Sequence, residues 1–389
     1  MTCDLSAGSI PDNVYIIACL ARFKGLAGLM EAGKVRTMIR KATRKRKATL
    51  VDVAQLAKVS TATVSRIFAS NGGVAHVADD TRERILAAAE LLNYTPNILA
   101  RSFRSQRSHA IGLLVSNMAH PHIVQAIEGV EKAAQEAGYV YVLSNSDDAL
   151  HRENLCRELF GQNRIDGAVL IGLPSPQEED TMISSLVRDG IPVALIGRIH
   201  AQTAVPCVSL DNIRGGRMAT EHLLGLGRRR IAYVAGCHYH SELRLKGYRQ
   251  ALAAAGIEED PALVIGGEGR DAAEGYAYMK KFLSKGTSPT GVFCFNDKMA
   301  FGVLKALHER GLSVPRDCAV VGFDDIEYCQ YSVPTLTSIS QPSFQMGYAA
   351  GKNLLALLEG NSDQEKRATI FDPTLVVRES TNPSARPAV

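Results

Sequence analysis

The sequence predicts a mixed α/β protein with an N-terminal helix-turn-helix domain of three helices, a hinge helix, and a core of two α/β subdomains with parallel sheets. Residues 49–68 place apolar side chains at helical spacing on both sides of a short break. From residue 108 onward, short apolar runs alternate with amphipathic segments, which is typical of parallel sheets covered by helices. The length of 389 residues exceeds one typical core.

The first helix is predicted to start after Thr49. Its hydroxyl can cap the helix, and Asp52, three residues later, completes a capping box and suits the positive end of the helix dipole. Val53 and Ala57 then share one apolar face. The helix is expected to end at a break formed by Lys58 and Val59.

A second helix is predicted to follow Ser60, whose side chain can cap it. Val64, Ile67 and Phe68 face inward at helical spacing. The outward face is short and polar and ends in an arginine, which suits the major groove of DNA; it consists of Thr61, Ala62, Ser65 and Arg66.

A third helix is predicted from Asp79 to Leu92, because two short helices bury too little surface alone. Acidic residues open it, and its apolar stripe is formed by Ile85, Leu86, Ala89 and Leu92. Any small helical domain shows such a stripe, so periodicity alone does not indicate DNA binding.

The distribution of charge favours DNA. Residues 34–108 contain fifteen Lys and Arg against five Asp and Glu, whereas the whole chain has 44 against 40. The segments on either side are therefore net acidic, and the positive charge is concentrated at the three helices and just before them. This concentration is typical of a protein that binds a polyanion. The run at residues 34–47 could also be a solvated tail, and only its position beside the helix-turn-helix favours DNA.

Five segments are predicted along the chain. Residues 1–48 form a basic, poorly ordered extension, with Met38 as a possible alternative start. Residues 49–95 form the helix-turn-helix domain, and residues 96–108 form a hinge whose Asn97–Phe103 is long enough for about two helical turns. Residues 109–379 form the core, and residues 380–389 form a disordered tail too short for a coiled coil.

The core is predicted from its alternating pattern. The predicted strands are residues 110–115, 140–144, 167–171, 193–196, 207–210, 231–235, 291–295 and 319–323. The predicted helices are residues 123–136, 153–162, 178–188, 214–226, 242–255, 271–284, 298–310 and 344–358. Roughly ten strands are more than one hydrophobic core usually holds. We therefore expect two linked subdomains with a cleft at the carboxyl ends of their strands.

Polar residues follow several of these strands and are therefore expected to line the cleft. They are Ser116 and Asn117, Gly197 and Arg198, Asn296 and Asp297, and Asp324 and Asp325. Amides, carboxylates and an arginine that converge in one place suit a polyhydroxyl ligand, because each hydroxyl must both donate and accept. For Asp297 and Asp325 the alternative is that they cap the helices that follow.

Several classes of protein fit the sequence poorly. The apolar run at residues 14–21 is too short to span a membrane and follows acidic residues, so we expect a cytoplasmic protein. The eight cysteines lack paired spacing, and most are expected to be buried. His120, His122, His238 and His240 have no accompanying ligand set for a metal, and we expect neither a metal nor a cofactor. No glycine-rich phosphate loop or nucleophile elbow follows a strand, which argues against an enzyme.

Several segments resemble one family in the order in which they occur, the lactose and galactose repressor (LacI/GalR) type of bacterial transcription regulator. The similar segments are Asp52–Ala54, Val59–Arg66, Asn93–Asn97, Ala100–Ser102, Ile111–Val115, Arg244–Tyr248, Phe295–Asp297, Val321–Asp325 and Leu336–Ile339. The resemblance covers residues 49–379 and implies a homodimeric repressor with a core like that of periplasmic sugar-binding proteins.

The resemblance also implies roles at the DNA. Two recognition helices of the dimer would enter the major grooves of a near-palindromic operator, with paired hinge helices in the central minor groove. Matching positions give Thr61, Ala62 and Arg66 as base-reading residues, and Ser60, Thr63, Ser65, Asn71, Tyr94 and Asn97 as backbone contacts. At the hinge, Ala100 and Phe103 match the minor-groove positions. Phe103 stands where the family usually has leucine, and phenylalanine is also a minor-groove wedge.

Lys58 is a second departure from the family, which often has a left-handed glycine at this turn of the helix-turn-helix. The resemblance therefore implies a left-handed turn at Lys58, and this conformation would cost a lysine on the order of 1 kcal/mol.

For the effector, the resemblance gives Arg244, Asn296 and Asp324 as the principal pocket residues. In the family, residues of the loop after the first strand usually pack on the ligand, and here this loop holds His120, His122 and Ile123. Asn117 and Arg198, which follow predicted strands, are also expected at the effector. We expect a sugar, sugar acid or sugar phosphate, and both induction and co-repression remain open. We also expect alanine at Arg244 or Asp324 to abolish the effector response but preserve folding. The alternatives are a periplasmic sugar-binding protein or an α/β enzyme without a recognised catalytic motif.

Overall fold

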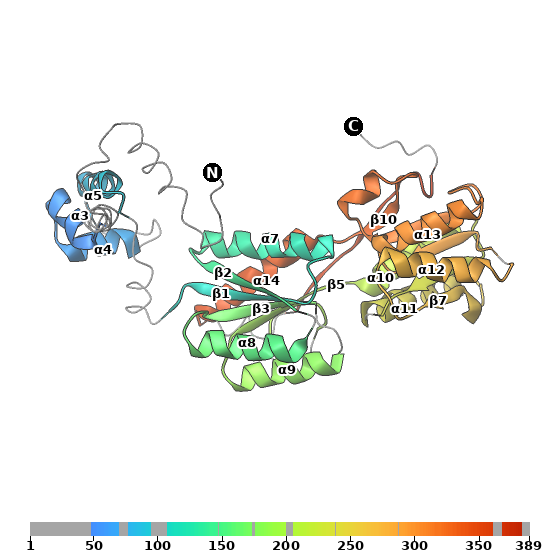
Figure 1. Ribbon diagram of the computed structural model, residues 1–389, viewed down its shortest axis with the longest axis horizontal. Coiled ribbons are helices and arrows are strands. Elements are labelled where there is room, and N and C mark those ends of the chain that lie inside the picture. Colours follow the sequence, from blue (N-terminus) through green and yellow to red (C-terminus); the bar gives the residue numbers. More distant parts are fainter. Residues whose placement is uncertain are drawn as a thin grey trace, which may run out of the picture. The chain divides into compact units, whose positions relative to one another are not determined.

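The computed structural model describes residues 48–69, 77–94, 107–146, 148–172, 176–199, 205–237, 239–286, 288–360 and 368–382 (Figure 1). The chain divides into two compact units, residues 1–97 and 98–389. The predicted basic extension up to residue 47 and the hinge helix at residues 97–103 lie outside the described residues. Within the described residues, no helix is both long enough and apolar enough to cross a membrane.

The first unit contains the three predicted helices α3 (Leu50–Ala57), α4 (Thr61–Ala69) and α5 (Asp79–Leu91). The capping box is present, since the Thr49 amide donates to Asp52 Oδ2 at 2.7 Å and the Asp52 amide donates to Thr49 Oγ1 at 3.4 Å. Lys58 ends α3 in the left-handed conformation, with φ 53° and ψ 48°. The expected turn geometry is therefore confirmed.

The small core of this unit differs from the prediction at one position. Val53, Val64 and Ile85 are completely buried at its centre. Leu86 does not belong to the predicted apolar stripe of α5, because 46% of it is exposed. Ala88 takes the inward position instead, three residues after Ile85 and close to one helical turn away.

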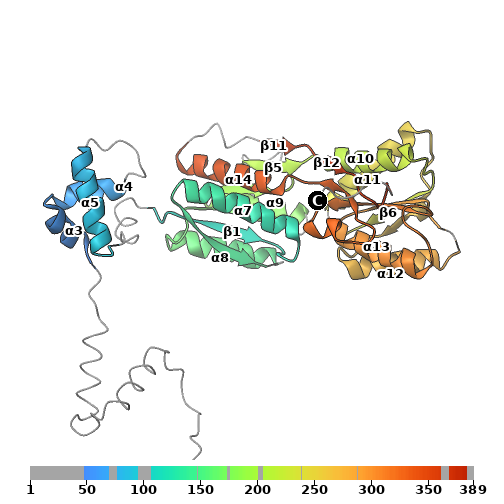
Figure 2. The ribbon, with the colours of Figure 1, turned by 90° about the horizontal axis from the view of Figure 1, so that it is seen from above.

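The second unit has two lobes, each with one six-stranded sheet (Figure 2). In the first lobe the strand order is β11-β5-β4-β3-β1-β2, and all neighbouring strands are parallel. The strands are β1 (Ala110–Val115), β2 (Val140–Asn145), β3 (Gly167–Ile171), β4 (Val193–Ile196), β5 (Cys207–Leu210) and β11 (Ala368–Phe371). Helices α7 (Pro121–Glu136) and α14 (Ser343–Leu358) pack on one face, and α8 (Ala149–Gly161) and α9 (Pro176–Arg188) pack on the other.

In the second lobe the order is β12-β10-β9-β8-β6-β7, and only the pairing of β10 with β12 is antiparallel. The strands are β6 (Ile231–Ala235), β7 (Val264–Gly266), β8 (Gly291–Cys294), β9 (Ala319–Asp324), β10 (Thr337–Ser340) and β12 (Thr374–Val376). One face carries α10 (Asn212–Gly225) and α11 (Tyr239–Ala254), and the other carries α12 (Ala272–Leu283) and α13 (Asp297–Glu309). Two short 3-10 helices, η1 (Pro261–Leu263) and η2 (Glu327–Gln330), complete this lobe.

Three pairs of helices approach each other closely, because glycines meet at their contacts. A Cβ on Gly216 of α10 would lie 2.1 Å from the Arg244 carbonyl oxygen of α11. Gly129 of α7 and Gly302 of α13 would collide in the same way with the backbones of α14 and α12. The contact between α10 and α11 matters for function, since it fixes the backbone of Arg244.

The chain passes between the lobes three times, after β5, after β10 and between β11 and β12. The two predicted parallel-sheet subdomains are thereby confirmed, and the eight predicted strands are all present, each with its end within one residue. Strands β7, β10, β11 and β12 were not predicted. Strands β7, β11 and β12 are not buried on both faces and β10 is mostly polar, so none of them shows the continuous apolar run that marks the equally short β4 and β8.

Some boundaries lie outside the predicted ranges. Helix α8 begins at Ala149 rather than residue 153, since the Asp148 side chain accepts hydrogen bonds from the Leu150 and His151 amides and caps it earlier. The core also continues past residue 379. Ser380 is completely buried and its hydroxyl donates to the Val320 carbonyl at 2.6 Å.

Candidate functional site

Helix α4 presents the predicted DNA-reading face. The Ser60 hydroxyl caps it by accepting from the Thr63 amide at 3.1 Å. Thr61, Ala62 and Arg66 are exposed on one side of the helix, while Val64 is completely buried on the other. Exposed side chains on a helix that is anchored by its apolar face can reach a groove without disturbing the fold.

Four of the residues predicted to contact the DNA backbone lie within the described residues. Ser60 is exposed, and Thr63, Ser65 and Tyr94 are partly buried. Tyr94 packs edge-on against Phe68 with ring centroids 5.6 Å apart, and burial raises the pKa of its hydroxyl. The remaining predictions, Asn71, Asn97, Ala100 and Phe103, lie outside the described residues.

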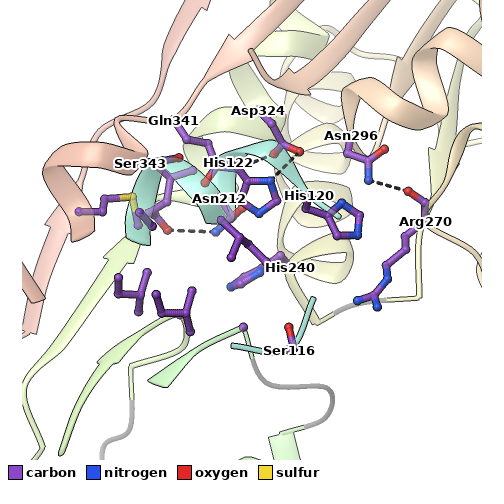
Figure 3. A pocket seen from close by; sticks show the side chains of 18 of the residues that line it. Ser116, His120, His122, Asn212, His240, Arg270, Asn296, Asp324, Gln341 and Ser343 are labelled. Atoms are coloured by element: carbon purple, nitrogen blue, oxygen red, sulfur yellow. Dashed lines mark hydrogen bonds and ion pairs between the residues drawn. The ribbon is translucent and has the colours of Figure 1, made fainter. Parts of the chain in front are cut away.

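A cavity opens between the two lobes of the second unit, where the carboxyl ends of both sheets meet (Figure 3). Its empty space, including open solvent at the mouth, is about 860 Å³. It is lined by Ser116, His120, His122, Ile123, Ala126, Ile171, Gly172, Ile196, Gly197, Leu210, Asn212, His240, Arg244, Arg270, Phe295, Asn296, Asp324, Gln341, Ser343 and Met346.

Arg244 is held in place on the second lobe's wall by contacts on all sides and is only 4% exposed. Its Nε donates to Asn212 Oδ1 at 2.9 Å, and another nitrogen donates to the Phe295 carbonyl. The guanidinium carbon lies 3.4 Å from the centroid of the Phe323 ring. Burial lowers the pKa of Arg244, and the nearby Asp324 opposes this shift, so the guanidinium keeps its charge.

Asp324 is the last residue of β9, and three side chains contact its carboxylate. Arg244 lies 3.8 Å and His122 Nδ1 3.4 Å from its carboxylate oxygens, and Gln341 Nε2 donates to the carboxylate. Burial alone would raise the pKa of Asp324, but His122, Arg244 and Gln341 together hold it below its usual value. The side chain is therefore an ionised acceptor inside the cavity.

The structure assigns the cap of α13 to Asn296 rather than Asp297. Asn296 Oδ1 accepts from the Met299 amide at 2.8 Å, and Nδ2 donates to the Arg270 carbonyl at 2.8 Å. Asp297 points into the core and accepts from Ile326 N at 2.9 Å and from a serine hydroxyl. Burial and the neighbouring Asp324 raise the pKa of Asp297 to about 8.

Asp325 is not a helix cap either. Its backbone has φ 55°, and its carboxylate pairs with Arg378 Nη1 at 2.8 Å. The two aspartates that follow their strands therefore serve the second lobe's own structure, and their helix-cap interpretation is wrong.

The first lobe contributes two histidines at the start of α7. His120 is 5% exposed, and its ring centroid lies 5.8 Å from that of His122. Burial, reinforced by the nearby His122, Lys298 and Arg270, lowers the pKa of His120 to about 4. His120 is thus neutral at physiological pH in this state, and it stands in a positive electrostatic environment.

Six of the eight predicted effector residues line the cavity, and Asn117 and Arg198 do not. Asn117 Oδ1 accepts from the Ala119 amide at 2.8 Å and closes a local turn. Arg198 is engaged by α9, with Nε 3.4 Å from Glu179 Oε2 and a second nitrogen bonded to Asp180. A position after a strand gives a residue's place at the sheet edge, but not the direction of its side chain.

Several lining residues were not predicted for the site. Arg270, Gln341 and Ser343 follow β7 and β10, which the sequence pattern did not reveal. Asn212 comes two residues after the end of β5, and its place after a strand was the signal that could have found it. Ser116 was expected at the cleft from its place after β1, whereas His240 was not among the residues predicted for the effector.

Metal ligation finds no support in the geometry of the described residues. They contain no group of three or more His, Cys, Asp or Glu side chains placed to hold an ion. Six cysteines are described; all are free, and all except Cys237 are buried, as expected for small apolar side chains.

Comparison with protein families gives two matches. Residues 49–97 match the family described as bacterial regulatory proteins, lacI family. Residues 220–381 match the periplasmic binding protein-like domain.

Curated relatives cover nearly the whole chain. The regulator CelR of Thermobifida fusca is 35% identical over 346 residues, covering 87% of this chain and 99% of CelR. The repressor PurR of Photobacterium profundum is 32% identical over 343 residues, covering 86% of this chain and 98% of PurR. The ribose operon repressor of Escherichia coli is 32% identical, with 86% and 99% covered.

Solved structures agree with these relatives. The lac repressor dimer bound to operator and the anti-inducer ONPF has a TM-score of 0.72 at 29% identity, over 86% of this chain and 99% of that one. The complex of the regulator CelR with cellobiose has a TM-score of 0.64 at 32% identity, over the same shares of the two chains.

Proposed function

Because the chain belongs to the lacI family of bacterial regulatory proteins and is a DNA-binding transcription regulator, we propose that it is a repressor whose operator affinity is set by a carbohydrate-derived effector. The observation that carries this proposal is the combination of an exposed, capped recognition helix with a polar cavity between two lobes. Its relatives are named as regulators, and we assign it no catalytic activity and a place in the cytoplasm, where its DNA partner lies.

At the DNA, Thr61, Ala62 and Arg66 are proposed to read base edges from the major groove. Arginine can bond two acceptors of guanine at once, which gives it most of the discrimination. Ser60, Thr63, Ser65 and Tyr94 would hold phosphates and set the register. Asn71, Asn97, Ala100 and Phe103 complete this proposal from the sequence.

At the effector, the second lobe offers an organised polar wall. Arg244, Asn296 and Asp324 are each at most 6% exposed and are fixed by neighbours, so their remaining donors and acceptors are already oriented. Across the cavity, His120, His122 and Ile123 come from the first lobe. A ligand that bonds both walls would favour a particular closure angle between the lobes.

Closure of the two lobes around an effector would be transmitted to the DNA-binding domain through the first lobe. The chain enters this lobe at Ser108 and His109, whose amides donate to the two carboxylate oxygens of Asp166 at 2.6 Å and 3.0 Å. Because this contact fixes where the hinge segment leaves the lobe, rotation of the lobe would move the hinge. The coupling is a difference in effector affinity between two lobe arrangements.

We also propose that the protein is a homodimer. The edge strand β2 exposes Val140, Val142 and Leu143 by 56%, 38% and 37%, and the second lobe exposes Tyr331 and Val333 by 69% and 95%. We propose exposed apolar side chains of these two regions as candidates for contact with the second subunit. Light scattering should give twice the chain mass of 42.0 kDa. A monomer at micromolar concentration would contradict the dimer.

The experiment that tests the function uses the full chain and fragments of its genome. Fluorescence anisotropy at increasing salt, with and without candidate sugars, should reveal a near-palindromic sequence that is preferred over bulk DNA. Its affinity should fall as salt rises and shift when the effector is added. Absence of any preferred fragment would refute the proposal.

A further inference from the structure

We propose that the effector is an anionic sugar derivative, with its acidic group against Arg270 and His120 and its hydroxyls against Asp324, Asn212 and Arg244. This inference rests on the proposed function and narrows the class of ligand for the same cavity. The shared chemistry is an oxyanion on a polyhydroxylated chain or ring, carried either by a carboxylate or by a phosphate.

The first support is the charge of the lining. Among the residues that line the cavity, two arginines and three histidines accompany a single carboxylate; the basic side chains are His120, His122, His240, Arg244 and Arg270. A neutral sugar requires balanced donors and acceptors, because each hydroxyl donates as well as accepts. This lining has a surplus of nitrogen groups that can donate to an acceptor or carry positive charge.

The second support is that the one carboxylate is already engaged. Arg244, His122 and Gln341 surround Asp324, and Arg244 and Asp324 are 5% and 6% exposed in their side chains. The negative charge is therefore compensated within the second lobe's polar wall. Asp324 raises the pKa of His120, but this effect is smaller than the opposite effects of His122, Lys298 and Arg270.

The third support is the arrangement of the two ends. In Figure 3, Arg270, His120 and Asn296 lie on one side of the cavity, whereas Gln341 and Ser343 lie on the other. The backbone of Arg270 is fixed, because its carbonyl accepts from Asn296 Nδ2 at 2.8 Å. Its guanidinium is a planar fork that matches the paired oxygens of a carboxylate or phosphate.

The environment of His120 agrees with this arrangement. Burial is the largest cause of its lowered pKa of about 4, and the next three causes are the neighbouring basic side chains of His122, Lys298 and Arg270. Lys298 itself pairs with Asp271, a carboxylate whose pKa is also lowered by His120 and Arg270. A bound anion would offset these charges and favour a proton on His120, which could then donate to it.

The apolar part of the lining also fits such a ligand. Ile123, Ile171 and Ile196 come from the first lobe, and Phe295 comes from the second. These side chains can cover the C–H faces of a sugar while the two polar ends hold its oxygens. The cavity therefore orients a molecule that has one charged end and one hydroxylated end.

The test is calorimetric titration of the full chain with D-gluconate, D-glucuronate, glucose 6-phosphate, their galactose counterparts, and both neutral hexoses. We expect one acid or phosphate to bind at least tenfold tighter than its neutral parent. Tight binding by a carboxylate identifies a sugar acid, and tight binding by a phosphate identifies a sugar phosphate. Equal or tighter binding of a neutral hexose, or no binding by any anion of the panel, would overturn the inference.

Arg270→Gln isolates the charged end. We expect this substitution to weaken binding of the anionic ligand tenfold or more. The control Arg310→Gln, at an exposed arginine after α13, should leave the affinity unchanged. Unchanged anion affinity in Arg270→Gln would also overturn the inference, provided that its melting temperature matches that of the wild type.

The two proposals fail separately. If a neutral sugar binds and shifts operator affinity, the regulator function stands and only the anionic effector is wrong. If no small molecule changes operator affinity, the effector-controlled function itself is wrong.

Discussion

The recognition helix and the cavity differ in how their functional residues are held. On α4 the supporting contacts are local, as between Ser60 and Thr63, and the reading residues are exposed. In the cavity, Arg244 bonds partners 32 and 51 residues away and is buried. The difference teaches that substitutions on the reading face should change binding alone, whereas substitutions in the cavity should change both binding and folding.

The strongest test of this contrast is Arg244→Ala. The sequence suggested that this variant would lose the effector response but keep its fold; the buried contacts revise that expectation. Removing the guanidinium leaves Asp324 buried beside an empty space, so we expect the free energy of unfolding to drop by about 3 kcal/mol or more. Urea denaturation measures the loss, and Arg249→Ala, at an arginine with 53% side-chain exposure, is the matched control. Equal stability of the two variants would break the contrast.

Asp297 should make the second lobe sensitive to pH. The native carboxyl keeps its proton up to about pH 8, while in the unfolded chain it loses the proton near its usual value of 3.8. Unfolding between these limits releases a proton, so stability should fall as pH rises from about 4 to 8. Denaturation curves at several pH values should show this fall in the wild type.

Asp297→Asn serves as the control, because its side chain does not titrate. The amide places a donor near Ile326 N or the Ser338 hydroxyl, so the variant should start about 1 to 3 kcal/mol less stable. The stability gap to the wild type should then narrow as pH rises. A gap that stays constant between pH 4 and 8 would show that Asp297 titrates normally.

The same contrast explains what could be predicted from sequence. The capping box of Thr49 and Asp52 depends on neighbours within a few residues and was predicted from them, and the family resemblance implied the left-handed Lys58. Strands of four or more buried residues were also found, since burial on both faces gives a continuous apolar run. The family resemblance supplied Arg244 and Asp324 to the cavity.

The remainder of the cavity could not be predicted, because it depends on pairing between distant segments. Arg270 follows β7, a strand of three residues that exists through its pairing with β6. Gln341 lies on a crossing between the lobes after β10, whose sequence is mostly polar. Arg198 was placed in the cavity from its strand end, but an acidic pair on α9 binds it instead.

Arg66→Ala tests the other side of the contrast. We expect discrimination between the operator and single-base variants to fall by about 1 to 3 kcal/mol at one position, with no change in melting temperature. Gel shifts with a series of operator variants measure the loss. Arg84→Ala, at an arginine of 47% side-chain exposure that pairs with Asp80, is the control for removing charge from the same unit. Unchanged operator preference would remove Arg66 from the reading face.

Lys58→Gly should have the smallest effect and the opposite sign. Lys58 occupies φ 53° and ψ 48°, a conformation that costs a side chain with a Cβ roughly 1 kcal/mol and costs glycine little. Hydrogen exchange at the Val53 amide in the full chain should therefore slow by about fivefold. If Lys58 also holds a phosphate, the variant should show a shallower decline of DNA affinity with salt, by about one unit of slope. Slower exchange with unchanged salt dependence would mean that the residue affects only the stability of the turn.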